Sequence, residues 1–160
     1  MLRHSISFLV VLTIALFLSS CAGHHTAALL DDVETYIQER PDSALATIRA
    51  IDTTTLTSRS LRAHFALLHA MALDKNWIDT TDVNVVMPAV EYYDRHPSGI
   101  RQAKAWYYLG RIQQNGNNRP DASISFMKAE RYAEDSDDSA FKALICLAIS
   151  KIYSQTHLHD

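Results

Sequence analysis

The sequence predicts an all-α protein of about seven helices, and three observations support this fold class. The chain of 160 residues has only four glycines and four prolines, which favours long helices over a turn-rich β architecture. Apolar residues recur three and four positions apart along most of the chain, as they do on one face of a helix. Ala70, Gly110 and Ser150 hold similar places in three of these helices, 40 residues apart, which indicates a repeated unit.

The composition is that of a folded domain. Hydrophobic residues make up 48% of the chain and charged residues 21%, and the formal net charge is −3. A disordered chain has fewer apolar residues relative to its charge. Because no segment is strongly basic, nucleic acid is not an expected partner.

The first twenty residues have the pattern of a secretory signal. Arg3 supplies a basic start, and the apolar run 6–18 is too short to span a bilayer comfortably. The run ends at Leu18-Ser19-Ser20-Cys21, which resembles the lipobox of bacterial lipoproteins. The resemblance implies acylation of the Cys21 thiol, and an ordinary signal peptide with a chance cysteine is the alternative.

This pattern predicts the domain organisation. We expect residues 1–20 to be a signal peptide, residues 21–28 a lipidated tether, and residues 29–160 the helical domain. Several acyl chains on Cys21 would give stable anchoring. We therefore expect a lipoprotein of the cell membrane or outer membrane that faces the periplasm.

Two short helices are expected after the tether. Apolar residues from Leu29 to Ile37 form the stripe of the first. The break Arg40-Pro41-Asp42-Ser43 ends this helix and begins the second, with Asp42 or Ser43 as its N-cap. The polar tract Asp52–Thr57 is expected to be a loop.

A long helix is expected at Ser58–Lys75, followed by a connector, Asn76–Thr81, that is unusually long. We expect Trp77 and Ile78 of this connector to fold back onto the neighbouring helices.

The next helix is expected at about 82–96. Pro88 falls inside this range, so we expect either a kink or a helix start near Met87. Pro97 closes the helix, and Ser98 is expected to cap the following one.

The segment Ala103–Ala129 reads as two amphipathic helices joined by a tight polar turn. Gly110 and Ala122 are small where the two helices would approach closely. The turn Asn115-Gly116-Asn117-Asn118 tolerates positive φ, and Pro120 suits the first turn of the second helix.

This hairpin resembles a tetratricopeptide (TPR) repeat, whose pattern is W-x2-L-G-x2-Y followed by A-x3-F and an alanine. Gln113 departs from the pattern, since it stands at the tyrosine position. The resemblance implies a right-handed α-solenoid in which the matching residues pack helices together. These residues are Trp106, Leu109, Gly110, Ala122, Phe126 and Ala129, with Ser150 and Tyr153 at the equivalent places of the last helix.

The last helix is expected at Phe141–Tyr153, after an acidic start at Asp135–Ser139. Cys146 lies in an apolar run and is expected to be buried. The chain stops at Asp160, where a turn into a partner helix belongs. We therefore expect the domain to be incomplete at its C-terminus and the chain to be a fragment of a longer protein.

No catalytic pattern is present in the sequence, which lacks G-x-S-x-G, H-E-x-x-H, C-x-x-C and a phosphate-binding glycine loop. We therefore expect no enzymatic activity, no cofactor and no metal site. A binding groove is expected instead, because first helices of stacked pairs line a concave face. Its candidate residues are Arg62, His69, Tyr107, Arg111 and Gln114, although Arg111 has an alternative role in a salt bridge between repeats.

The lipobox together with these repeats resembles TPR lipoproteins of the Bacteroidetes type. The resemblance implies a membrane-anchored, non-catalytic module that binds a protein or peptide in the periplasm. An alternative is the extracytoplasmic sensor part of a transmembrane regulator whose effector region is missing.

Overall fold

The computed structural model describes residues 24–157. The predicted signal peptide and Cys21 lie outside the described residues. A helix at residues 24–36 comes first. The further elements are α2 (Pro41–Ala50), η1 (Thr53–Thr55), α3 (Arg59–Lys75), η2 (Val83–Val85), α4 (Met87–Arg95), α5 (Ile100–Asn115), α6 (Arg119–Ala133) and α7 (Ser139–His157). The described residues form helices and no strand, which confirms the predicted all-α class.

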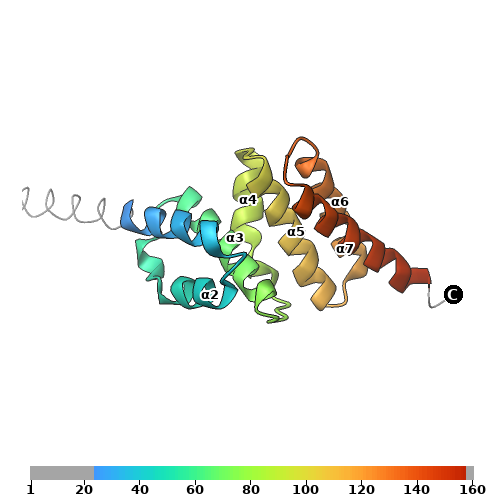
Figure 1. The fold of residues 1–160 in the computed structure, drawn as a ribbon, viewed down its shortest axis with the longest axis horizontal. Helices are drawn as coiled ribbons and strands as arrows, with labels where there is room; N and C mark the ends of the chain where they lie inside the picture. Colours follow the sequence, from blue (N-terminus) through green and yellow to red (C-terminus); the bar gives the residue numbers. More distant parts are fainter. Residues whose placement is uncertain (1–23, 158–160) are drawn as a thin grey trace, which may run out of the picture.

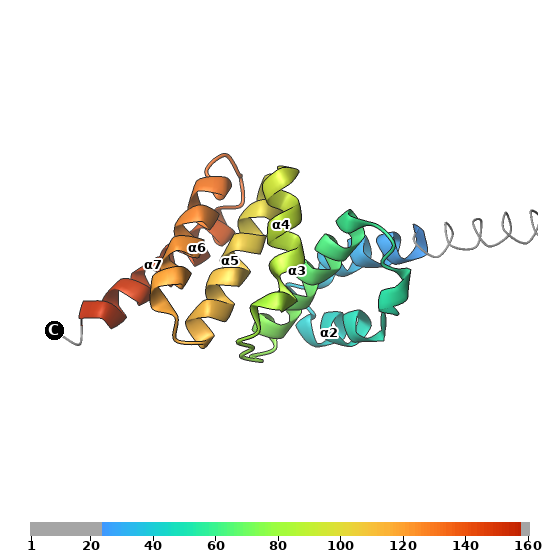
Figure 2. The same cartoon turned by 180° about the vertical axis from the view of Figure 1, so that it is seen from behind.

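The helices lie side by side in a row along the long axis of the molecule (Figures 1 and 2). The helix at 24–36 and α2 lie at one end and α7 at the other. Within the row, α5 and α6 form a hairpin with a short turn, and α3 packs on α4. No helix among residues 24–157 has both the length and the apolar character needed to cross a membrane.

Helix starts differ from the sequence prediction at two places. Pro41 occupies the first turn of α2, where its fixed φ suits a helix and its missing N–H is not needed, and Arg40 is the N-cap. The expected capping by Asp42 or Ser43 is therefore wrong. Gly99, with φ 53°, is the N-cap of α5 in place of Ser98. The expected start near Met87 is confirmed.

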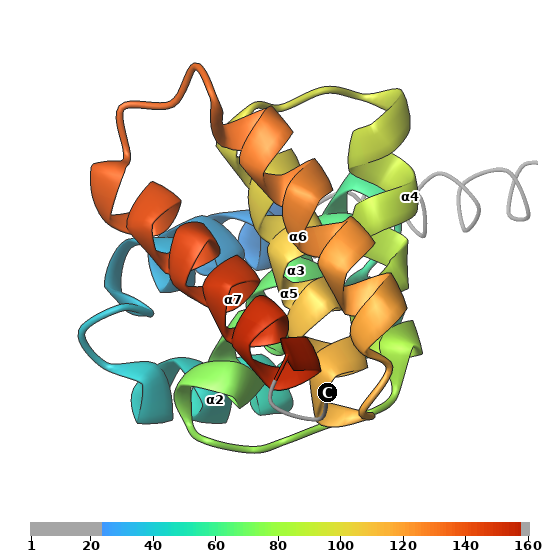
Figure 3. The same ribbon diagram turned by 90° about the vertical axis from the view of Figure 1, so that its right-hand side faces the viewer.

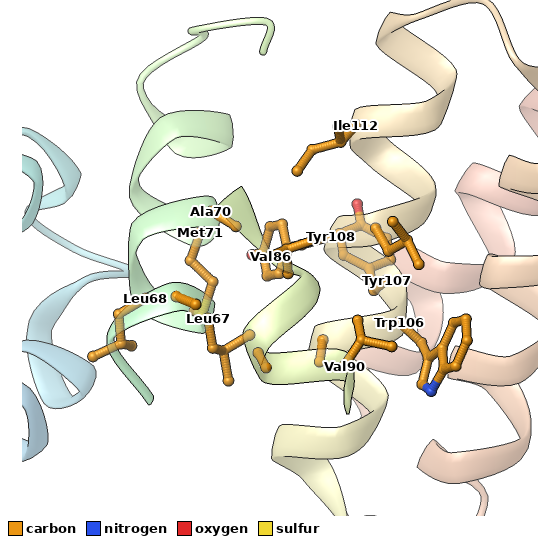
Figure 4. Close-up of a cluster of buried hydrophobic side chains, with 14 of the residues drawn as sticks. Leu67, Leu68, Ala70, Met71, Val86, Val90, Trp106, Tyr107, Tyr108 and Ile112 are labelled. Carbon is orange, nitrogen blue, oxygen red and sulfur yellow. The ribbon is translucent and has the colours of Figure 1, made fainter. Parts of the chain in front are cut away.

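The core between the central helices is continuous. Figure 4 shows side chains of α3, α4 and α5 pointing toward one another, among them Leu67, Met71, Val90 and Tyr108. Burial of such side chains from water is the main favourable term in folding. Tyr108 is only 3% exposed and points from α5 toward the side chains of α3 and α4 (Figure 4).

Gly110 allows α5 and α6 to approach closely. A Cβ atom at this position would lie 2.6 Å from Cε1 of Phe126, whose side chain is fully buried. The predicted packing residues Trp106, Leu109, Ala122 and Ala129 are buried as well. Gln113, which departs from the TPR pattern, accepts a hydrogen bond of 2.7 Å from the buried hydroxyl of Ser125.

We predict that Gly110→Ala lowers the free energy of unfolding by about 1–2 kcal/mol, because the strain of overpacking exceeds the gain in helix propensity. Chemical denaturation measures this change. Gly116→Ala is the matched control, since its nearest contact would be an ordinary 3.5 Å. Equal stability of the two variants would show that the Phe126 ring does not restrict position 110.

The structure places several other residues differently from expectation. Cys146 is exposed, because Phe141, Ile145, Ala148 and Ile152 form the buried face of α7. Ser150 and Tyr153 lie on the exposed side of the same helix, Tyr153 being 54% exposed, and not between helices. Trp77 and Ile78 are exposed and do not fold back onto the neighbouring helices.

Candidate functional site

Trp77 is the most unusual residue of the described chain. It directly follows the C-cap of α3, its indole side chain is 88% exposed, and its backbone has φ 58°. The amide of Trp77 donates to the carbonyl of Asp74, and that of Ile78 donates to the carbonyl of Leu73. These two bonds form a Schellman motif, in which the left-handed residue is usually glycine or asparagine.

Helix α5 ends in the same way 40 residues later. Asn117 has φ 58°, its amide donates to the carbonyl of Gln114, and the next amide donates to the carbonyl of Gln113. Asparagine tolerates this conformation, whereas tryptophan is strained in it. Since the Trp77 ring is almost wholly exposed, its own burial does not offset the strain. Backbone strain of this kind gathers at functional sites.

A groove lies beside Trp77, with a volume of about 370 Å³. Three helices contribute to it, and Figure 3 shows them from the end of the row, with α7 nearest the viewer. The lining residues are Asp74, Lys75, Trp77, Tyr107, Tyr108, Arg111, Leu144, Leu147, Ala148 and Lys151. A second hollow of about 310 Å³ shares Trp77, Arg111 and Lys151 with the groove and continues it toward Gln114 and Asn117.

The floor of the groove is polar and fixed by hydrogen bonds. The Nε of Arg111 lies 2.8 Å from Oδ1 of Asp74, and its Nη1 donates to Oε1 of Gln114 at 3.0 Å. Burial works against the guanidinium charge, but the nearby Asp74 carboxylate holds the pKa of Arg111 above its usual value. Burial raises the pKa of Tyr107 to about 12, so its hydroxyl stays neutral.

The α7 side of the groove is apolar. Leu147 is 67% exposed and Leu144 is 39% exposed, and both line the groove together with Trp77. Exposed large apolar side chains that gather around a hollow are typical of interaction sites. The site therefore combines an apolar wall with a polar floor.

The structure brings together three of the five predicted groove residues. Tyr107, Arg111 and Gln114 line the two hollows, and the predicted salt bridge of Arg111 is also present. Arg62 lies at the other end of α3, where it donates to the carbonyl of Leu56. His69 is half-buried beside Phe65, and burial lowers its pKa, with a smaller effect from the charge of Arg49.

The sequence did not predict the residues that supply the apolar surface and the lysines of the groove. These are Trp77, Lys75, Leu144, Leu147 and Lys151. One signal was available, because the long connector Asn76–Thr81 holds a tryptophan where a repeat needs only a turn.

A second cluster joins the helix at 24–36 to α3 and α5. Nε2 of His64 lies 3.0 Å from a Glu34 oxygen, and the Arg101 guanidinium donates to both Glu34 oxygens. Burial opposes ionisation of Glu34, but the hydrogen bonds and charges of His64 and Arg101 lower its pKa to about 2. Possible ligand atoms of Asp31, Glu34 and His64 lie within 4.8 Å of one another, as a cation site requires. Arg101 already supplies a positive charge there, so the cluster is a structural ion-pair network.

Comparisons of the chain with protein-family models, with curated proteins and with solved structures return no match. The functional proposal rests on the groove beside Trp77.

Proposed function

We propose that the protein is a non-catalytic interaction module whose groove between α3, α5 and α7 binds a segment of another protein. The observation that carries the proposal is Trp77, a strained residue with an almost wholly exposed indole at the groove's edge. Tryptophan side chains are enriched among the residues that dominate binding energy. Leu144 and Leu147 offer a second apolar surface in the same groove.

The repeated geometry supports a TPR-like solenoid as the scaffold of this module. Trp77 and Asn117 end equivalent helices 40 residues apart, and the Phe126 ring fits over Gly110 as the TPR pattern implies. In a solenoid of this kind, the first helices of successive pairs line one face. The groove is lined by α3, α5 and α7, and in such a solenoid these would be the first helices of three successive pairs.

Site-specific crosslinking tests the proposal in cells that produce the full chain. A photo-crosslinking amino acid at Leu147, inside the groove, is expected to form protein adducts that disappear when Trp77→Asn is added. The same amino acid at Ile124, half exposed on α6 and outside the groove, is the control. Adducts that persist with Trp77→Asn, or form equally at position 124, would contradict the proposal.

Membrane attachment through Cys21 is the second part of the proposed function. It rests on the sequence Leu18-Ser19-Ser20-Cys21, which resembles a lipobox. We predict that a clickable palmitate analogue labels the parent chain, and that Cys21→Ser abolishes the label, because only a thiol accepts the diacylglycerol. Cys146→Ser is the control, since it removes an exposed thiol outside the lipobox. Undiminished labelling of Cys21→Ser would show that Cys21 is not the anchor.

A further inference from the structure

We infer that the groove selects peptide segments in which acidic residues flank a bulky apolar residue. This inference rests on the proposed function and names the chemistry of the partner.

The groove has the opposite sign of charge to the chain as a whole. The full chain carries a formal net charge of −3. Along the two connected hollows, however, cationic side chains outnumber carboxylates: the cations are Lys75, Arg111, Arg119 and Lys151, and the carboxylates are Asp74 and Asp79.

Among the described residues of the two hollows, two lysines and one carboxylate, Asp79, have no ion pair, so the charge left for a ligand is positive. Asp74 already pairs with Arg111, so its negative charge is compensated within the floor. Lys75 and Lys151 make no ion pair within residues 24–154, and they reach the groove from α3 and α7. Complementary charge guides association and discriminates against partners of the wrong sign.

The second hollow also holds a buried hydrogen-bond donor that has no acceptor among the described residues. The Oε1 atom of Gln114 accepts from Arg111, which fixes the orientation of the amide. The Nε2 atom then points into buried space with no partner among the described residues. An unsatisfied buried donor costs about 1–3 kcal/mol. A carboxylate or carbonyl oxygen of a ligand in this hollow would supply the missing acceptor if the Gln114 side chain turned toward it, because the donor is buried in the unbound structure.

The apolar component comes from Trp77 and the two leucines of α7. Trp77 lines both hollows, so a side chain bound against it lies close to Lys75, Lys151 and Arg111. The hollow is a recess between three helices with the buried Tyr107 and Tyr108 in its lining, which favours an inserted side chain over a planar membrane surface. A peptide with one bulky apolar residue between carboxylates fits both the recess and the charge.

Selection from a random peptide library tests the inference. Twelve-residue peptides displayed on phage are selected on the intact, purified chain, and the enriched sequences are synthesised with a fluorescein label. We expect enrichment of Asp and Glu beside Phe, Leu, Ile or Trp. Measured by fluorescence anisotropy, Lys75→Glu with Lys151→Glu is expected to weaken binding at least about tenfold, because it reverses both free charges.

The control is a second double variant with the same change in net charge, made outside the groove. Arg59→Glu with Arg95→Glu alters two exposed residues outside the groove and is expected to leave affinity within about twofold. Circular dichroism verifies that both double variants are folded.

Each outcome is decisive. Enrichment of neutral or basic peptides whose binding still requires Trp77 would overturn the inference and leave the proposed function intact. The inference also fails if acidic peptides bind both double variants equally. If no peptide is enriched, or binding is unaffected by Trp77→Asn, both the inference and the proposed function fail.

Discussion

Replacing Trp77 with asparagine is expected to stabilise the protein while removing most of its affinity for peptides. Asparagine adopts φ 58° at the equivalent position of α5, and tryptophan in this conformation costs about 1 kcal/mol. The free energy of unfolding should therefore rise by about 1 kcal/mol in chemical denaturation. Loss of a tryptophan anchor costs about 2 kcal/mol of binding energy, so affinity for the selected peptides should fall about 30-fold.

The variant Trp77→Ala separates the two effects. It removes the indole but introduces a residue that does not favour positive φ. It should therefore lose the same affinity as Trp77→Asn with little gain in stability. If Trp77→Asn lowered stability, the ring would have a packing role that its exposure does not indicate.

Acidification is expected to weaken the fold through Glu34. The pKa of this carboxyl is about 2 in the folded protein and about 4.3 when unfolded, so its contribution is complete above the unfolded value. That contribution is lost as the pH falls from about 4.3 toward 2. With allowance for partial exposure to solvent, we expect Glu34 to account for about 2 kcal/mol of the stability lost over this range.

The variant Glu34→Gln measures this contribution. It should be less stable than the parent at pH 7 and should show a smaller loss of stability between pH 5 and pH 2. Glu39→Gln is the control, because Glu39 is exposed just beyond the helix at 24–36. If the two variants had the same dependence on pH, the Arg101–Glu34–His64 network would not contribute to stability.

The sequence predicted the helices well because their signals are local. The spacing of apolar residues in Ala103–Ala129 predicts a hairpin, and Gly110 and Phe126 meet in the structure as that spacing requires. The long helix predicted at Ser58–Lys75 is present at Arg59–Lys75, and Ser58 is its N-cap. The starts of α2 and α5 were predicted less accurately, because the backbone geometry of Pro41 and Gly99 determines where these helices begin.

The groove was only partly predictable because it depends on tertiary arrangement. Arg62 and His69 belong to the expected helix, but only the C-terminal end of α3 reaches the groove. Cys146 was expected to be buried because its neighbours are apolar. Which face of α7 is covered depends on its packing in the row, and that face excludes Cys146.

The prediction that Trp77 folds back onto the neighbouring helices is wrong for a different reason. Hydrophobicity alone predicts that tryptophan packs against neighbouring helices. Its position in a Schellman motif instead directs it away from the core. The length of the connector marks this segment as unusual, but a tryptophan does not indicate the left-handed geometry, since the position normally favours glycine or asparagine.

The most direct test of the groove is the response of the two indole N–H signals to peptide in a nitrogen–proton NMR spectrum. The chain has only two tryptophans, and the exposed Trp77 and the buried Trp106 serve as probe and internal control. The Trp106 indole donates to Asp94 at 2.8 Å, and Asp94 does not line the groove. Titration with a selected peptide is expected to shift the Trp77 signal and leave that of Trp106 in place. A bound peptide that leaves the Trp77 signal unchanged would contradict the assignment of the groove as the binding site.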